Sequence, residues 1–133
     1  MLTLLKIKDE TTVSIGKPEN VFTVAVTGET ITVRELIRSR IEQEVEQYNR
    51  KQPQAFRLLV QPGGAERVLN GFRLTKPRLI DPEAQYRKAI EAFEGNGFIV
   101  LVNDKQVESL EDRILLSPET TVTFLKLVPL VGG

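Results

Sequence analysis

The stretch VFTVAVTGETITVRELIRSRIEQEVEQYN, residues 21–49, decides the fold class because it contains two hydrophobic periods in succession. Residues 22–27 alternate apolar side chains with threonine and alanine, a period of two that predicts a half-buried strand. Apolar residues then recur at steps of three and four, which predicts one helix stripe made of Val33, Leu36, Ile37, Ile41, Val45 and Tyr48. Thr32 and Glu35 have capping-box spacing, so we expect a helix from Val33 to Asn49.

Further strands surround this helix in the sequence. Residues 2–10 (LTLLKIKDE) read as a strand, and turn residues at 16–20 would join it to the next strand as a hairpin. The apolar run 98–107 (FIVLVNDKQV) predicts a central strand, an Asn103-Asp104 turn and a short return strand. Residues 121–127 (TVTFLKL) predict the last strand. Several strands around one long helix indicate an α+β domain whose helix packs on one sheet face.

The middle of the chain, at about 51–97, is predicted to be an inserted segment with its own helix. Asp81 is a suitable N-cap and Pro82 suits the first helical position, so we expect this helix from Pro82 to Glu94. Residues 56–60 (FRLLV) could form a short strand, and the cap spacing of Ser109 and Asp112 predicts a short helical turn. The pair Gly63-Gly64 is expected to be a plain turn, because a phosphate loop would be followed by lysine and a hydroxyl residue.

Composition excludes several functional classes. The 133 residues fit a single domain, 1–133, and 18 basic residues balance 18 acidic ones. That balance argues against nucleic-acid binding and against a polybasic membrane anchor. The chain has no cysteine and no histidine, which removes thiol catalysis, the commonest general base and the commonest metal ligand. We therefore expect no enzyme activity, no resident cofactor and no metal.

The sequence also lacks the hydrophobic patterns of a membrane span and of a signal peptide. No apolar run reaches the length of a membrane span, and the first residues lack the apolar core and cleavage-type ending of a signal peptide. The sequence interpretation therefore places the protein in the cytoplasm, without contact to membranes.

The stretch LSPETTVTFLKLVPLVGG, residues 116–133, resembles the end of the ubiquitin-like β-grasp proteins. In that family a hairpin is followed by a long helix and further strands, and the last strand leads to Gly-Gly. TITVRELI, residues 30–37, is similar to the start of the family helix, and residues 98–107 to a strand-turn-strand of the bacterial sulfur carriers for thiamine and molybdopterin synthesis. The resemblance covers residues 2–48 and 98–133. It implies a β-grasp mixed sheet packed on one long helix, with the inserted segment as an addition.

The resemblance implies that the terminal carboxylate is the reactive group. A partner activating enzyme would use ATP to adenylate Gly133, and Gly132 would give clearance behind it because glycine has no Cβ. Residues 128–133 would form a flexible tail, stiffened locally by Pro129. Recognition by the activating enzyme would fall on Leu127, Val128, Pro129, Leu130 and Val131. By period two, Leu125 and Leu127 face away from the core, so they form either an exposed apolar patch or a surface covered by the inserted segment.

Three functions stay open on the sequence. The first is a ubiquitin-like modifier joined to target proteins in a bacterial conjugation pathway, linked to defence against phage by analogy only. Its partners would be the activating enzyme, a conjugating enzyme, a deconjugating peptidase and covalent targets. The second is a sulfur carrier whose terminus becomes a thiocarboxylate for cofactor or tRNA thiolation. The third is a non-conjugated β-grasp scaffold or oligomerisation module. The extra surface of the inserted segment favours the modifier, and homo-oligomer formation stays open.

Overall fold

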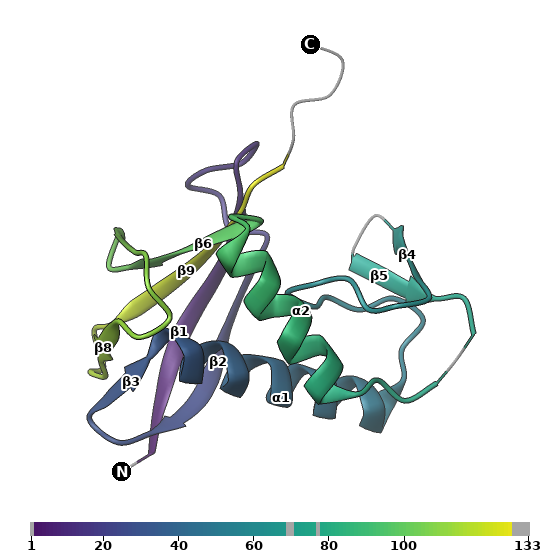
Figure 1. Ribbon diagram of the computed structural model, residues 1–133, viewed down its shortest axis with the longest axis horizontal. Coiled ribbons are helices and arrows are strands. Elements are labelled where there is room, and N and C mark those ends of the chain that lie inside the picture. Colours follow the sequence, from purple (N-terminus) through teal and green to yellow (C-terminus); the bar gives the residue numbers. More distant parts are fainter. Residues whose placement is uncertain (1, 69–70, 77, 129–133) are drawn as a thin grey trace.

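The computed structural model describes residues 2–68, 71–76 and 78–128, and these form an α+β structure with a mixed sheet and two helices (Figure 1). The elements are β1 (Leu2–Thr11), β2 (Asn20–Thr27), β3 (Thr30–Thr32), α1 (Val33–Lys51), β4 (Ala65–Val68), β5 (Gly71–Leu74), α2 (Pro82–Glu94), β6 (Phe98–Val102), β7 (Lys105–Val107), β8 (Arg113–Leu115) and β9 (Thr121–Lys126). The predicted strands at both ends of the chain and both predicted helices are confirmed.

The main sheet has five strands in the order β2-β1-β9-β6-β7. β1 and β2 form the predicted antiparallel hairpin. β9 lies between β1 and β6: it runs parallel to β1, with Val122 opposite Ile7, and antiparallel to β6, with Phe124 opposite Val100. The last strand therefore has ladder partners on both sides and occupies the centre of the sheet.

Helix α1 begins at a complete capping box. The Thr32 hydroxyl accepts a hydrogen bond from the Glu35 N–H at 3.1 Å, and the Glu35 carboxylate accepts one from the Thr32 N–H at 3.2 Å. Figure 1 shows α1 running across one face of the sheet, and all six residues of the predicted stripe are buried. They pack with inward residues of the strands, which include Leu5, Ile7, Val24, Val122 and Phe124. The hydrophobic core therefore lies between α1 and the sheet.

The inserted segment attaches to α1 rather than to the sheet alone. Helix α2 packs along α1, and the Arg38 guanidinium lies 3.8 Å from the Tyr86 ring centroid while pairing with Glu83 at 3.1 Å. Near the end of α1, the Asn49 side chain exchanges two hydrogen bonds with the backbone of Ile80, at 2.8 and 3.0 Å. Helix α2 therefore packs mainly on α1, and its Phe93 ring also lies 5.9 Å from the ring of Phe98 on β6.

The prediction of a strand at residues 56–60 is wrong. Only Phe56 pairs, through a single antiparallel bridge with Phe72, and residues 57–60 form no ladder. The segment contains instead the hairpin β4–β5, which the sequence did not predict because its strands have only four residues each. Such a short pair is not stable alone, so its formation depends on packing against Phe56. The expected turn at Gly63-Gly64 is confirmed.

The segment between β7 and β9 contains the single turn expected from the cap spacing of Ser109 and Asp112. The Asp112 N–H donates to the Ser109 carbonyl at 3.0 Å, and the Asp112 carboxylate accepts the Ser109 N–H at 3.2 Å. The chain then adds β8, which pairs with β3 just before α1. Three residues that pair with a strand far away in sequence leave too short a pattern to predict.

Candidate functional site

The sequence-predicted site at the end of the chain is only partly among the described residues. Leu125, Leu127 and Val128 are described, whereas Pro129, Leu130, Val131, Gly132 and Gly133 lie outside the described residues. The described part of this site is the point where the chain leaves the sheet after β9.

Backbone and hydroxyl contacts hold the end of β9. The Thr12 N–H donates to the Lys126 carbonyl at 3.1 Å, and the Leu127 N–H donates to the Gly97 carbonyl at 3.1 Å. The Val128 N–H then donates to the Thr12 hydroxyl at 3.0 Å. Thr12, just after β1, and Gly97, just before β6, thus hold residues 126–128 from the two sides of the strand. Val128 therefore marks a defined exit point beside the ends of β1 and β6.

Leu125 does not form an exposed apolar patch. It is only 8% exposed, between Glu10 of β1 and Ile99 of β6 in the ladder, so the patch interpretation is wrong at this position. Leu125 belongs to a central strand and therefore has ladder neighbours on both sides. Leu127 is 38% exposed and Val128 is half-buried.

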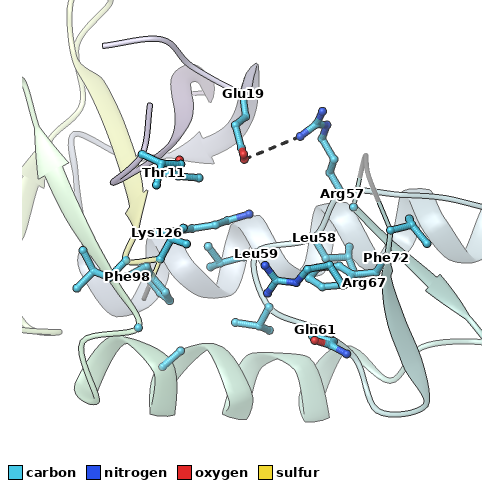
Figure 2. A pocket seen from close by; sticks show the side chains of 18 residues that line it. Thr11, Glu19, Arg57, Leu58, Leu59, Gln61, Arg67, Phe72, Phe98 and Lys126 are labelled. Atoms are coloured by element: carbon cyan, nitrogen blue, oxygen red, sulfur yellow. Dashed lines mark ion pairs between the residues drawn. The ribbon is translucent and has the colours of Figure 1, made fainter. Parts of the chain in front are cut away.

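Next to this exit point lies a cleft of about 400 Å³ between the inserted segment and the end of the sheet (Figure 2). Its far wall comes from residues 57–61 and the β4–β5 hairpin, and its near wall from Thr11, Phe98 and residues 126–128. Leu59, Phe72 and Phe98 supply apolar surface. The structure therefore brings the inserted segment next to Leu127 and Val128. The sequence analysis left such a cover over Leu127 open as one of two alternatives, but it did not name the inserted residues.

The hairpin wall is held by a close backbone approach at Gly71. Its φ is +136°, and a Cβ at this position would lie 2.0 Å from the Phe56 carbonyl oxygen. The Phe56 and Phe72 backbones exchange two hydrogen bonds, at 3.0 and 2.8 Å. Only glycine permits this backbone conformation and approach, so Gly71 fixes where the Phe72 side chain meets the cleft.

Charges of the cleft are predominantly positive. Arg57, Arg67 and Lys126 line it together with a single acid, Glu19, which lies 4.0 Å from the Arg57 guanidinium. Burial lowers the pKa of Lys126, the attraction of Asp9 opposes this shift, and the repulsion of Arg40 adds to it. The Lys126 ammonium thus sits where its charged form is poorly solvated.

Beneath the cleft lies a buried ionic network that joins three parts of the fold. Both carboxylate oxygens of Asp9 accept hydrogen bonds from Arg40, at 2.6 and 2.7 Å, and the side chains are 3% and 2% exposed. Glu44 receives a third hydrogen bond from Arg40 at 3.3 Å, and its other oxygen accepts the Leu59 N–H at 3.0 Å. The network therefore connects β1, α1 and the inserted wall of the cleft.

The guanidinium of Arg40 also lies between two aromatic rings. Its central carbon is 4.9 Å from the Phe22 centroid and 4.6 Å from the Phe124 centroid. Burial opposes the charge of Arg40 most strongly, but the attraction of Glu44 and Asp9 outweighs it and raises its pKa. Arg40 therefore stays charged inside the core.

Sequence reasoning missed this network, although one signal was present. Arg40 lies three residues after Ile37 and four after Leu36, so it falls within the apolar stripe of α1. A charged residue within a buried stripe requires a buried partner. The sequence did not name the partner, because Asp9 is remote in the chain.

Two further classes of site are absent from the described part of the chain. Residues 2–68, 71–76 and 78–128 contain no group of three or more acidic, histidine or cysteine side chains arranged to hold a metal ion. No helix among these residues has the length and apolar character needed to cross a membrane. Comparison with protein-family models, curated proteins and solved structures found no match.

Proposed function

We propose that the chain is a ubiquitin-like β-grasp protein that acts as a protein modifier. In this proposal a partner activating enzyme uses ATP to adenylate the carboxylate of Gly133 and releases pyrophosphate. An amine of a target protein then attacks the activated carbonyl, which forms an amide and releases AMP and a proton. The chain itself contributes the acyl group and no catalytic residue. The proposal requires that the mature chain end at Gly133.

One observation carries the proposal: the last strand is central, and it ends at a fixed exit point. β9 pairs with both β1 and β6, and the Thr12 side chain holds Val128 immediately after it. Residues that follow such a strand are attached to the most strongly bonded part of the sheet. They can be offered to a partner without loosening the core.

The arrangement of the described elements is compatible with a β-grasp. A hairpin comes first, a long helix packs on one face of the sheet, and the last strand joins the first in parallel. The inserted segment adds a helix and a hairpin that the sulfur carriers lack, and these provide additional surface for partners that read a modifier.

The test is a search for covalent adducts in the native host. Lys126 is the last basic residue, so trypsin would leave LVPLVGG, residues 127–133, on each modified lysine of a target. We expect peptides with this remnant when N-terminally tagged protein is recovered under denaturing conditions. Deletion of Gly133, or Gly132→Phe, should abolish them while circular dichroism stays unchanged. Glu119→Ala, in the exposed turn before β9, is the matched control.

Intact mass decides between the remaining functions. If sulfur replaces one oxygen of the protein and no conjugates are found, the protein is a sulfur carrier and the modifier proposal is wrong. If the chain ends at Gly133 and neither adduct forms, the terminus is unreactive and the scaffold function remains. A mass that shows further residues after Gly133 would also contradict the proposal.

A further inference from the structure

The cleft contains two cations without an acidic partner. Figure 2 shows Lys126 and Arg67 directed into the cleft from its two walls. Among the described residues, neither has a carboxylate oxygen within 4.0 Å, whereas Arg57 has Glu19 at that distance. One carboxylate facing three cations leaves an excess of positive charge in the cleft. This excess would attract an anion.

Much of the remaining lining of the cleft is apolar and held in place. Leu59, Phe72 and Phe98 line it, and each is less than 10% exposed. The volume of about 400 Å³ lies within the range of about 300–1,000 Å³ typical of small-molecule sites. Leu127, which also lines the cleft, is 38% exposed, and a charged head group alone would leave its side chain in water. The ligand should therefore carry an apolar body as well.

We propose that the cleft binds an amphipathic organic anion, whose oxyanion head group lies between Lys126 and Arg67. Its apolar body packs on Leu127 and on the accessible edges of Leu59, Phe72 and Phe98. The head group is a carboxylate or a phosphate monoester, because both present two oxygens to a guanidinium. The inference does not rest on the proposed function, since no residue after Val128 takes part.

Two features of the site support this assignment. The Lys126 ammonium is partly desolvated, as the lowering of its pKa by burial indicates, so an adjacent anion would stabilise its charged form. The Phe72 wall is fixed by the Gly71 approach and by the hydrogen bonds to Phe56, so the apolar surface exists before any ligand arrives. A preformed site loses less conformational entropy on binding.

The test uses the intact chain and four matched probes. Octanoate and octyl phosphate, below their micellar concentrations, are titrated by calorimetry and by amide NMR spectra. Octanol lacks the charge, and acetate lacks the apolar body. We expect saturable one-to-one binding of at least one octyl anion, with shifts at the amides of Leu59, Phe72 and Gly97, and binding about tenfold weaker for octanol and acetate.

Charge-removing variants locate the head group. Lys126→Met keeps the unbranched stem and Arg67→Gln keeps a polar end, and each should weaken binding of the octyl anion by about tenfold. Lys105→Met, on β7 at the other edge of the sheet, should leave it unchanged. Unchanged binding in both cleft variants, equal binding of octanol, or no saturable binding of either octyl anion to the wild type would overturn the proposal. The probe comparison stands even if a variant fails to fold.

Discussion

Asp9 on β1 and Arg40 on α1 form a bidentate ion pair that is almost completely buried in the core, with guanidinium nitrogen to carboxylate oxygen distances of 2.6 and 2.7 Å. Asp9 lies opposite Phe124 in the parallel ladder, and Phe124 in turn packs on the Arg40 guanidinium. The pair thus links the long helix to the two central strands. Because both charges are desolvated, each depends on the other.

Removing one member of this pair should destabilise the protein strongly. Asp9→Ala leaves a buried guanidinium with only Glu44 as partner, so we expect a loss of about 3–5 kcal/mol in the free energy of unfolding, measured by urea denaturation. The triple variant Asp9→Leu, Arg40→Met and Glu44→Gln should be more stable than Asp9→Ala, because no unpaired charge remains and the glutamine oxygen can still accept the Leu59 N–H. Arg50→Ala, which breaks an exposed pair with Glu46, is the control and should cost about 0.5 kcal/mol or less.

Glu44 should impose a pH dependence on stability. Burial raises its pKa above the ordinary 4.5, although Arg40 and the Leu59 N–H oppose the shift. Folded Glu44 therefore holds its proton more tightly than unfolded Glu44. Its contribution to the free energy of unfolding is largest below about pH 4.5 and falls as pH rises through the folded pKa.

The difference in unfolding free energy between the wild type and Glu44→Gln isolates this effect. We expect that difference to decrease as the pH is raised from about 4.5 towards neutrality, because only the wild type loses a proton there. For Glu46→Gln, on the exposed side of the same helix, the difference in unfolding free energy from the wild type should change much less with pH. A wild-type advantage that grows with pH would show that Glu44 is stabilised as a carboxylate instead.

Gly71→Ala should detach the hairpin wall of the cleft. The new Cβ would collide with the Phe56 carbonyl. We therefore expect the free energy of unfolding to fall by about 1–3 kcal/mol, in addition to the cost of placing alanine at a positive φ. Hydrogen exchange at the Phe56 and Phe72 amides reports the docking directly. Gly64→Ala is the matched control, because Gly64 has φ +72° but no atom within 4 Å of the new Cβ. Equal protection of these amides in both variants would show that the approach is not required.

Thr32→Ala should weaken the start of α1. The variant leaves the Glu35 N–H without its hydroxyl acceptor, for an expected cost of about 1 kcal/mol in unfolding free energy, measured by thermal and urea denaturation. Thr32→Ser keeps the hydroxyl and should retain most of that stability. If the serine variant lost as much as alanine, the effect would come from the β3–β8 pairing and not from the cap.

Where patterns were long, sequence analysis succeeded. The capping box, the six-residue stripe of α1 and the Asp81-Pro82 start of α2 are local features, and each was confirmed. The short pairings β3–β8 and β4–β5 were missed, because each strand has only three or four residues and its partner strand supplies the stability. At the candidate site, the sequence singled out Leu127 and Val128 but not the inserted residues that share the cleft with them.

The sequence by itself determined the helices, the main strands and the neutral balance of charge, because these depend on residue type and on periods of two and 3.6 along the chain. Only the tertiary structure decided that Leu125 is buried, that Arg40 and Asp9 meet, and that Lys126 faces Arg67 across a cleft. The two charged pairs join residues about 30 to 60 positions apart, and the burial of Leu125 accompanies the central position of β9 in the sheet. They arise from how the strands and helices pack, which no local pattern encodes.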